Sequence, residues 1–474
     1  MNENKDEPFI APNPEETITS ESSFEELSKQ PTIEDFLKLE RLRSTPFSKK
    51  IFEGLQKGSL SSAVILWVRM TMGIGVMTLP YYISYFGVLS GSIALLIGGL
   101  FSLMSFSFIF EACDVSGETN YKDLIDQMLP GIISVMFKYS YLYDLCIVLI
   151  LYSVVGWNLF CYFLGFTGFL KPEWIRDHNK MLLYEYNPEV FTIRAIFFLV
   201  IFIFSTPLFL KKTLGRMKNI AYGFLAVMVG FQVYIMAEGP FFRSYYESKN
   251  ELQVEYLSKT PSPIWITNFF AMVCSYYVQP FILLLRDQVV NPTLKRSRRL
   301  ATYSVFIEIF IYILFASVCY ISFGDKYTTP LMLLRVPYEG KGDISETVFK
   351  ICFFMFFALN ILGLCNYNPG IRDYLFKLFG ESKSRTSYAL MSLLPFFICC
   401  IVGVLVPNII NLFGFNGLVM HNFTGFIIPC FLKLKILEIK MIKGIRVWLI
   451  YLLIFFYFTC MFVGSAVKIY DMIK

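Results

Sequence analysis

Two glycines and a proline interrupt the apolar stretch TMGIGVMTLPYYISYFG, residues 71–87. Gly73, Gly75 and Pro80 belong to the two residue types that weaken a helix most. A break in a helix leaves N–H and C=O groups without intrahelical partners, and lipid offers no water to satisfy them. We therefore expect this break to face a cavity, where the freed backbone groups can bind something polar.

A second stretch of the same kind, CSYYVQPF, occupies residues 274–281 and lies at the same relative position within its own apolar segment. Ser275, Tyr276 and Tyr277 shortly precede Pro280, which cannot donate a helical hydrogen bond. Two interrupted segments in corresponding positions of two halves of a chain are typical of a membrane transporter built from inverted repeats. The sequence therefore predicts that the two breaks together hold a polar cargo near the middle of the membrane.

The composition identifies the chain as a polytopic membrane protein of the all-α class. Of its 474 residues, 55% are hydrophobic and only 16% are charged, whereas soluble domains carry about 25% charged residues. Apolar runs of roughly 20 residues, the length that spans a bilayer, recur along nearly the whole chain. The net charge of +6 lies in short loops between these runs, so we expect no binding to nucleic acid.

We expect about eleven transmembrane helices. Their approximate limits are 59–86, 88–112, 132–166, 190–210, 216–238, 264–289, 301–323, 345–368, 387–406, 411–433 and 445–468. The loops 211–218, 286–299, 376–385 and 433–446 hold most of the loop Lys and Arg residues, which the positive-inside rule assigns to the cytosol. This orientation places the N-terminus in the cytosol and the C-terminus on the other side.

Residues 1–56 differ in kind from the rest of the chain. They are acidic and polar and contain prolines, which predicts a disordered cytosolic tail. The start lacks the basic residues and the apolar segment of a signal peptide. We expect residues 57–474 to form the transmembrane domain, with one repeat at about 59–238, the second at about 264–433 and an eleventh helix at about 445–468.

Residues that could ligate a metal or catalyse a reaction are scarce. The eleven cysteines lie mostly in apolar runs and form no CxxC pair, which favours buried packing over disulfides or metal sites. The chain has two histidines, His178 and His421, and no GxxxxGK[ST] loop for ATP. We therefore expect no metal, no cofactor and no enzymatic activity.

Four stretches resemble the amino acid/auxin permease superfamily, which includes the vacuolar amino acid transporters and the neutral amino acid transporters of animal cells. GIGVMTLPYY (73–82) is similar to the GxGxxxLPxx signature of the family's first helix, and NPTLKRSRR (291–299) to the basic loop after the sixth. SVCYISFGD (317–325) is similar to the YxxFG end of the seventh helix. The run from Val406 to Lys435 parallels the family's pattern across helices nine and ten. Each match alone is weak, but together and in the family's order they are specific.

The resemblance implies eleven helices in an inverted five-plus-five repeat of the LeuT/APC type, with the first and sixth helices broken. It also implies secondary active transport of small amino acids, which we expect to occur by alternating access, but it does not fix the amino acid, the coupling ion or the direction, so symport and antiport both stay open. We expect a monomer, in the plasma membrane or in a vacuolar or endolysosomal membrane. The alternative is an amino acid sensor on the same fold that signals through the acidic tail. Deletion of residues 1–50 separates the two, because transport would survive it and signalling would not.

An amino acid is a zwitterion, so a site for it needs N–H donors for the carboxylate and oxygen acceptors for the ammonium group. Gly73, Ile74, Gly75 and Val76 are expected to bind the carboxylate, because the start of a half-helix offers free N–H groups and the positive end of the helix dipole. The alternative is that the two glycines only permit close helix packing.

The expected partners of the ammonium group are the freed carbonyls of Ser275, Tyr276 and Tyr277, and a tyrosine could cover the pocket. The alternative is that these residues are ordinary core aromatics and their neighbours. Tyr152, near the middle of the third span, could face the same cavity or simply pack.

Ion coupling has four candidate residues. Sodium-coupled relatives that this chain resembles carry Asn four residues before the first glycine, where it helps to hold sodium, but Arg69 occupies that position here. Arg69 could therefore replace the sodium ion, or its side chain could snorkel to lipid headgroups. Asp144 and Glu308 are intramembrane acids that could carry a coupling proton or pair with Arg69. Asn360 could line the ion path or bond across helices. We expect a proton rather than sodium as the coupling ion, or transport that is independent of sodium.

Overall fold

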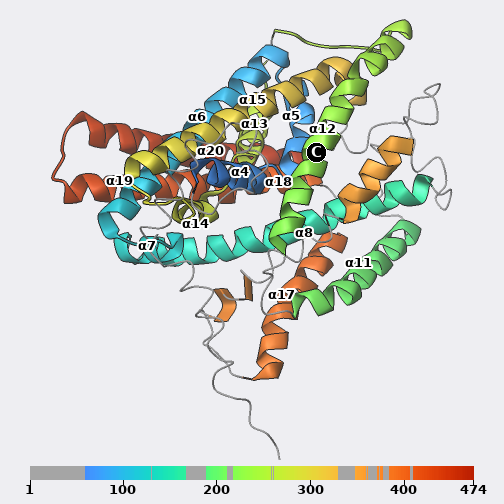
Figure 1. The fold of residues 1–474 in the computed structure, drawn as a ribbon. Coiled ribbons are helices and arrows are strands. Elements are labelled where there is room, and N and C mark those ends of the chain that lie inside the picture. Colours follow the sequence, from blue (N-terminus) through green and yellow to red (C-terminus); the bar gives the residue numbers. More distant parts are fainter. Residues whose placement is uncertain are drawn as a thin grey trace, which may run out of the picture. The chain divides into compact units, whose positions relative to one another are not determined.

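The computed structural model describes residues 59–129, 131–166, 188–210, 217–257, 259, 261–328, 347–358, 360, 371–372, 374–376, 384–405 and 409–473. This part of the chain consists of helices and the segments that connect them, with no strand (Figure 1). Residues Leu60–Lys474 form one compact unit. The tail expected at residues 1–56 lies outside the described residues.

The helices follow one another along the chain in two series. The first series is α4 (Leu60–Thr71), α5 (Ile74–Ser84), α6 (Val88–Ser116), α7 (Tyr121–Met128), α8 (Ile132–Phe166), α11 (Pro188–Phe209) and α12 (Met217–Ser248). The second series is α13 (Ile264–Cys274), η3 (Gln279–Phe281), α14 (Ile282–Asp287), α15 (Leu294–Tyr327), α17 (Arg385–Leu405), α18 (Ile409–Asn416), η5 (Gly417–His421), η6 (Phe423–Ile427), α19 (Ile428–Ile439) and α20 (Ile445–Ile473).

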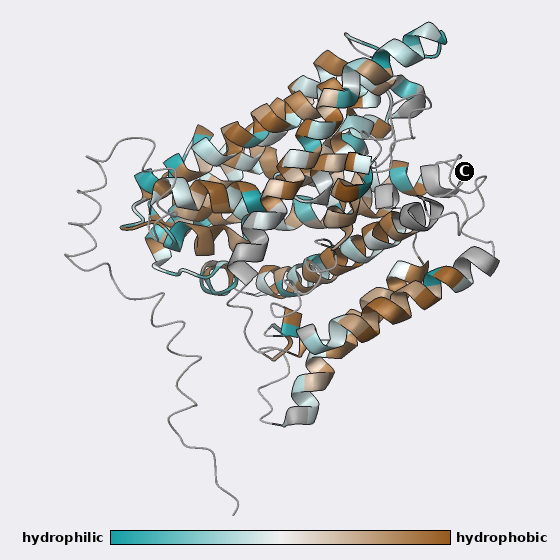
Figure 2. Cartoon of the chain, turned by 45° about the vertical axis from the view of Figure 1, so that its right-hand side comes forward, coloured by the Kyte–Doolittle hydropathy of each residue, from teal (hydrophilic) through white to brown (hydrophobic). Residues whose placement is uncertain are grey.

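The described chain contains eight helical segments that are long and apolar enough to cross a membrane, and the bent pair α4 and α5 makes a ninth. Two shorter apolar helices, Thr192–Pro207 and Thr347–Ala358, coincide with two further predicted spans. Hydrophobic residues cover most of the length of these helices (Figure 2). The multi-pass, all-helical architecture is therefore confirmed, whereas eleven spans and the inverted repeat stay predictions.

The first membrane segment is broken within the glycine motif. α4 ends at Thr71, Met72 and Gly73 lie outside any helix, and α5 then begins at Ile74, with a bend of 62° between the two helices. In the segment 264–287, residues 275–278 likewise separate α13 from η3 without helical structure. The sequence thus located both interruptions.

A third irregularity was not predicted. Between α18 and α19 the chain continues through η5 and η6, which are wider π-helical turns with Asn422 between them. A π-helical turn has i→i+5 hydrogen bonds and is frequent at functional sites. The span Leu412–Ile439 therefore crosses the membrane with a local change of helical geometry near its middle.

Glycines on α6 let two other helices approach it closely. A Cβ atom at Gly99 would lie 2.6 Å from the Cδ1 atom of Ile309 on α15, and one at Gly98 would lie 2.7 Å from Val273 on α13. α15 accordingly packs along α6 (Figure 1). Small residues commonly serve this purpose in membrane helices, where close van der Waals packing is a main source of association.

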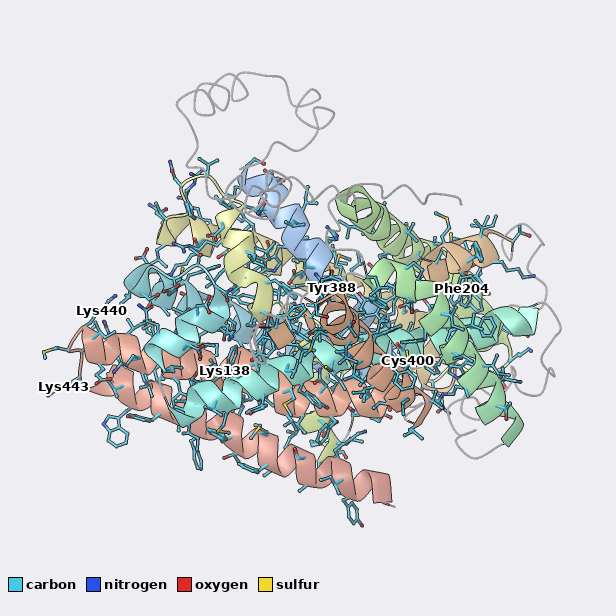
Figure 3. All side chains as sticks on the ribbon, turned by 90° about the horizontal axis from the view of Figure 1, so that it is seen from below. Lys138, Phe204, Tyr388, Cys400, Lys440 and Lys443 are labelled. Carbon is cyan, nitrogen blue, oxygen red and sulfur yellow. The ribbon has the colours of Figure 1, made fainter. Side chains whose placement is uncertain are left out.

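Basic residues gather at helix ends. Arg298, in the basic run 295–299, and Lys433 on α19 both pair with Glu111 near the end of α6. Lys440 and Lys443 lie at the turn between α19 and α20 (Figure 3). Part of the predicted basic loop therefore connects α6, α15 and α19 through the ion pairs with Glu111, in addition to any contact with lipid headgroups.

The segment after α12 supplies hydrogen-bond acceptors for the first N–H groups of α6. The first three N–H groups of α6, residues 88–90, donate to the carbonyls of residues 255–257 at 3.0, 2.9 and 3.3 Å. The first N–H groups of a helix have no acceptor within the helix. This segment supplies those acceptors and so holds the junction between α5 and α6.

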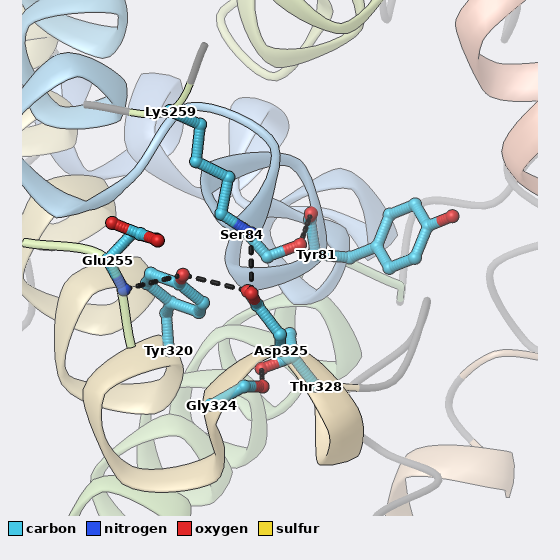
Figure 4. A network of polar contacts seen from close by, with 8 residues as sticks. All are labelled: Tyr81, Ser84, Glu255, Lys259, Tyr320, Gly324, Asp325 and Thr328. Atoms are coloured by element: carbon cyan, nitrogen blue, oxygen red, sulfur yellow. Dashed lines mark hydrogen bonds and ion pairs between the residues drawn. The ribbon is translucent and has the colours of Figure 1, made fainter. Parts of the chain in front are cut away.

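The same segment is fastened to the end of α15. Lys259 pairs with Asp325 at 2.6 Å, and Tyr320 donates a hydrogen bond of 2.8 Å to the other oxygen of the same carboxylate (Figure 4). The N–H of Asp325 donates to the Gln253 carbonyl at 2.8 Å. This approach requires Gly324, which has a φ of 63° and whose Cβ position lies 2.7 Å from that carbonyl oxygen.

Substitution of Gly324 by Ala should therefore lower the thermal stability of the detergent-solubilised protein. The backbone conformation of Gly324, with φ 63° and ψ −174°, is essentially restricted to glycine and costs another residue about 1–3 kcal/mol. The overlap with Gln253 adds to that cost. The matched control is Gly444→Ala, since Gly444 has a φ of 96° but no described atom within 4 Å of its Cβ position. Equal losses of Tm in the two variants would contradict a close contact at Gly324.

Candidate functional site

The break in the first span exposes the start of a half-helix. The N–H of Met72 donates to the Val68 carbonyl at 2.8 Å, and the N–H of Gly73 donates to Thr71 at 2.7 Å. Gly73 itself is extended, with φ −102° and ψ −156°. The N–H groups of Ile74 and Gly75 open the next helix, where no preceding turn offers them acceptors. They are therefore available to an anion.

The two glycines of the motif have different surroundings. A Cβ atom at Gly75 would lie 2.8 Å from the Cζ atom of Phe413 on α18 and 3.2 Å from the Oγ atom of Ser275. At Gly73 the nearest described atom to the same position is the Thr71 carbonyl oxygen, at 3.9 Å. Close packing thus accounts for Gly75, whereas Gly73 borders space that the described residues leave open.

The second break meets the first through Ser275. This residue is buried, and its Oγ atom, which faces Gly75, has no hydrogen-bond partner among the described residues. Its carbonyl accepts a hydrogen bond of 3.0 Å from Tyr312 on α15. The side chain of Ser275 is therefore the unpartnered polar group between the two breaks, and its carbonyl, one of the expected ammonium acceptors, already has a donor.

Tyr276 and Tyr277 lie on different sides of the interrupted span. The Tyr276 ring packs against Tyr312 with 5.0 Å between centroids, and its hydroxyl donates to the Leu95 carbonyl of α6 at 3.2 Å. Tyr277 instead donates to Asp144 on α8 at 2.8 Å. The Tyr276 hydroxyl thus connects the break to α6 by a hydrogen bond, and the Tyr277 hydroxyl connects it to α8 in the same way.

Asp144 joins three spans through hydroxyl groups. Its Oδ2 atom accepts hydrogen bonds from Tyr277 at 2.8 Å and from Thr424 of η6 at 2.9 Å, and the two hydroxyl oxygens lie 2.7 Å apart. Asp144 is 3% exposed, and its Oδ1 atom has no partner in the described part of the chain. The predicted acid therefore lies at the second break, together with a residue of span ten that the sequence did not indicate.

Side chains from other helices satisfy the carbonyls of the π-helical turns. Tyr121 on α7 donates to the Thr424 carbonyl at 3.0 Å, and both Gln279 and Ser105 donate to the Gly425 carbonyl. Burial, and then the nearby Asp144 charge, raise the pKa of Tyr121 well above its usual value, so this hydroxyl remains a neutral donor at physiological pH. Neither Thr424 nor Tyr121 carried a signal in the sequence, because a π-helical turn has no residue pattern of its own.

His421 lies against the same cluster. Its ring meets the Tyr277 ring edge-on with 3.7 Å between centroids, and its Nδ1 atom lies 3.1 Å from the Cys274 sulfur and 3.0 Å from the Asn416 amide nitrogen. No group of three potential metal ligands occurs among the described residues. His421 therefore supports the packing between span ten and the second break.

Glu308 on α15 lies at the first break. It is fully buried, and its Oε1 atom accepts a hydrogen bond of 2.5 Å from the hydroxyl of Thr71, the last residue of α4. Its Oε2 atom has no partner in the part of the chain that the structure describes. Each break is therefore in contact with one buried carboxyl group.

The remaining predicted residues are Tyr152, Asn360 and Arg69. The Asn360 amide donates to the Tyr152 carbonyl at 2.8 Å, so these two residues form a contact between α8 and the helix that contains Asn360. Arg69 is half-buried on α4, two residues before Thr71. The structure thus brings Gly75, Ser275 and the two acids to the breaks, and joins Tyr152 with Asn360 in a separate contact.

A protein family and two curated proteins to which this chain is similar are described as amino acid transporters. A family model described as "Transmembrane amino acid transporter protein" matches residues 56–474. Two curated proteins named "Putative amino acid transporter AAT1", from Plasmodium berghei (strain Anka) and Plasmodium falciparum (isolate 3D7), are each 20% identical over 72% of this chain and 53% of their own length. The chain spans about half the length of these curated relatives.

The two glycines provide a matched pair of substitutions. Gly75→Ala should destabilise the detergent-solubilised protein, because the new methyl group overlaps Phe413 and overpacking costs about 1–3 kcal/mol. Gly73→Ala should leave Tm nearly unchanged, because its Cβ has room. The second change Phe413→Leu should restore part of the stability lost by Gly75→Ala. Equal Tm values for the two single variants would contradict this difference in packing.

Proposed function

Because the chain belongs to the transmembrane amino acid transporter protein family, whose model matches residues 56–474, we propose that it is a secondary active transporter that carries amino acids by alternating access. Membership of this family points to a transport protein and not to an enzyme. The observation that carries the proposal is the break at Gly73, where a half-helix starts beside open space within a membrane segment. A helix start of this kind attracts a carboxylate at low cost.

We assign the substrate carboxylate to the N–H groups of Ile74 and Gly75, with Val76 in the same first turn. Gly73 is extended and α5 begins directly after it, so these N–H groups belong to the first turn of the helix. A side chain at Gly73 would intrude on the space beside them. The fit to a carboxylate follows from the N–H donors and from the helix dipole, both of which favour negative charge.

The ammonium group of the substrate is assigned to the second break. Ser275 offers a buried hydroxyl that lacks a partner in the described chain and lies next to Gly75. The backbone of Tyr276 and Tyr277 adds carbonyl groups, while their side chains hold the break to α6 and α8. We also propose Tyr152 on α8 as a substrate contact; its carbonyl accepts a hydrogen bond from Asn360 in a separate contact.

A proton is the coupling ion that we propose. Two buried carboxyl groups, Asp144 and Glu308, lie at the two breaks, and acids inside membrane segments are typical of proton pathways. Arg69 replaces the Asn that sodium-coupled relatives carry, so we propose that its positive charge makes a sodium ion unnecessary. Asn360 is the fourth candidate for ion coupling, and its amide donates a hydrogen bond to the Tyr152 carbonyl of α8.

The proposal includes a monomer with eleven helices, an inverted five-plus-five repeat and a cytosolic N-terminus, in the plasma membrane or in a vacuolar or endolysosomal membrane. The positive charge of the loops supports this orientation. The sensor alternative would act through residues 1–56, which lie outside the described residues. Deletion of residues 1–50 separates the two, because transport would survive it and signalling would not.

Liposomes that contain the purified full-length chain should accumulate labelled amino acids when a proton gradient is imposed. The experiment screens the twenty standard amino acids under an inward proton gradient and then under an inward sodium gradient, with empty liposomes as the control. We expect accumulation of at least one amino acid with the proton gradient and no requirement for sodium. No uptake of any amino acid under either gradient would contradict the proposed function, and a strict sodium requirement would contradict the role of Arg69.

Gly73→Val should impair uptake of the transported amino acid without loss of the folded protein. The isopropyl group enters the space next to the N–H groups of Ile74 and Gly75, so we expect the KM to rise by about tenfold or more, which corresponds to about 1.4 kcal/mol of binding. Gly230→Val on α12 is the control, because no described atom lies within 4 Å of its Cβ position. An unchanged KM in Gly73→Val would place the substrate elsewhere.

A further inference from the structure

Glu308 is a buried carboxyl group that the substrate site does not use. It lies on α15 and meets the hydroxyl of Thr71, which ends α4. The carbonyl of Thr71 accepts the N–H of Gly73 at 2.7 Å. A change in the charge of Glu308 therefore acts directly on the last residue before the break.

The Thr71 hydroxyl has several acceptors within reach, the Tyr312 hydroxyl among them, but only one proton to donate. Besides Glu308 at 2.5 Å, it lies 3.0 Å from the Val68 carbonyl and 3.3 Å from the Trp67 carbonyl. When Glu308 is ionised, the hydroxyl donates to the carboxylate. When Glu308 is protonated, its own O–H can donate to Thr71, and the Thr71 hydroxyl can then donate to Val68.

The two acids at the breaks differ in their donors. Asp144 accepts two hydrogen bonds, from Tyr277 and Thr424. Glu308 accepts a hydrogen bond from Thr71, and the ring N–H of Trp67, also on α4, is a second donor beside it. A buried carboxylate is costly unless several donors satisfy it. Both acids have donors nearby, but those of Glu308 lie on α4 directly before the first break, whereas those of Asp144 connect the second break to span ten. Glu308 is therefore the acid whose protonation can act on the first break.

The titratable groups near Glu308 on the adjoining elements are two tyrosine hydroxyls. Tyr312 lies one turn further along α15, and Tyr276 belongs to the second break. Their hydroxyls donate to the carbonyls of Ser275 and Leu95. Both hydroxyls therefore donate elsewhere, and that of Tyr312 can in addition accept a hydrogen bond from Thr71. The donors beside the Glu308 carboxyl group are Thr71 and the ring N–H of Trp67.

Charged side chains on the helices around α15 lie away from this position. On α4, Trp67 shares the face of Thr71, whereas Arg69 is two residues away, a rotation of about 200° around the helix. Residues 74–110, which include α5 and most of α6, contain no Asp, Glu, Lys, Arg or His. On α12, Glu238 lies beside Gly239, which packs against Ser322 near the far end of α15.

We propose that Glu308 binds the coupling proton, and that the Thr71 hydroxyl transmits its protonation state to the break at Gly73. This inference rests on the amino acid transport proposed above. A proton from one side of the membrane binds the carboxylate, and the Thr71 hydroxyl turns from Glu308 to the Val68 carbonyl, adding a hydrogen bond to the last turn of α4. Release of the same proton on the other side reverses the change, so the proton is carried and not consumed.

The test compares two kinds of transport by Glu308→Gln in liposomes. Accumulation driven by a proton gradient should fall by about tenfold or more, because Gln can donate to Thr71 but cannot exchange a proton. Counterflow exchange of labelled for unlabelled amino acid needs no net proton movement and should persist, measured with the amino acid that the wild type accumulates most. Proton-driven accumulation at the wild-type level in Glu308→Gln would overturn the proposal.

Glu238→Gln is the matched control for loss of a buried acid. Glu238 is also buried within a span and accepts a hydrogen bond from a hydroxyl, that of Tyr234, but it is not at a break. Its variant should keep accumulation driven by the proton gradient. A loss equal to that in Glu308→Gln would show that the effect is not specific to Glu308 and would overturn the proposal.

Variants of Thr71 test the hydroxyl and remain informative if Glu308→Gln does not fold. Thr71→Ser keeps the hydroxyl and should retain the wild-type accumulation ratio, whereas Thr71→Val keeps the shape and should lower that ratio severalfold. Equal ratios in these two variants would overturn the link through Thr71. If the wild type transports no amino acid by gradient or by counterflow, the proposed function itself fails, which is a different outcome from any of these.

Discussion

The structure depends on satisfying backbone polar groups where helices are interrupted within the membrane. Lipid supplies no donors or acceptors, so each freed N–H or C=O group must find a partner in the protein or a ligand. At the second break and in the π-helical turns, hydroxyl and amide side chains meet this need: Tyr312 donates to Ser275, Tyr121 to Thr424, and Gln279 to Gly425. At the first break, no described side chain accepts a hydrogen bond from the first N–H groups of α5. In our account that difference leaves the N–H groups of Ile74 and Gly75 to the substrate.

Hydroxyl groups also connect the interruptions to the buried acids. Tyr277 and Thr424 join Asp144, and Thr71 joins Glu308, so neither carboxyl group contacts a break except through a side chain that can donate in more than one direction. A hydroxyl can change its acceptor by rotation about one bond, without movement of the backbone. This property allows a small event, the arrival of a proton, to alter the end of a helix.

The sequence predicted the features that depend on residue type and missed those that depend on tertiary contact. Gly73 located the first break because glycine acts on the backbone directly, whereas Pro80, which was expected to interrupt the same segment, lies inside α5. Asp144 and Glu308 were identified because acids are rare in apolar spans. The partners of these acids could not be predicted, since Thr71, Tyr277 and Thr424 resemble many other Thr and Tyr residues in the chain. The different roles of Tyr276 and Tyr277 follow from which side of the span each faces, and that is set by the irregular backbone at residues 275–278. The π-helical turns have no sequence pattern, because they arise where side chains from α6, α7 and η3 supply donors.

Direct observation of a bound amino acid tests the central claim best. The full-length protein in lipid nanodiscs, saturated with an amino acid that it transports, can be examined by cryo-electron microscopy. We predict that the carboxylate of the ligand lies at hydrogen-bond distance, about 3 Å, from the N–H groups of Ile74 and Gly75, with α4 and α5 still separated at Gly73. A ligand bound away from both interruptions, or a continuous helix through residues 60–84 in the complex, would contradict the account.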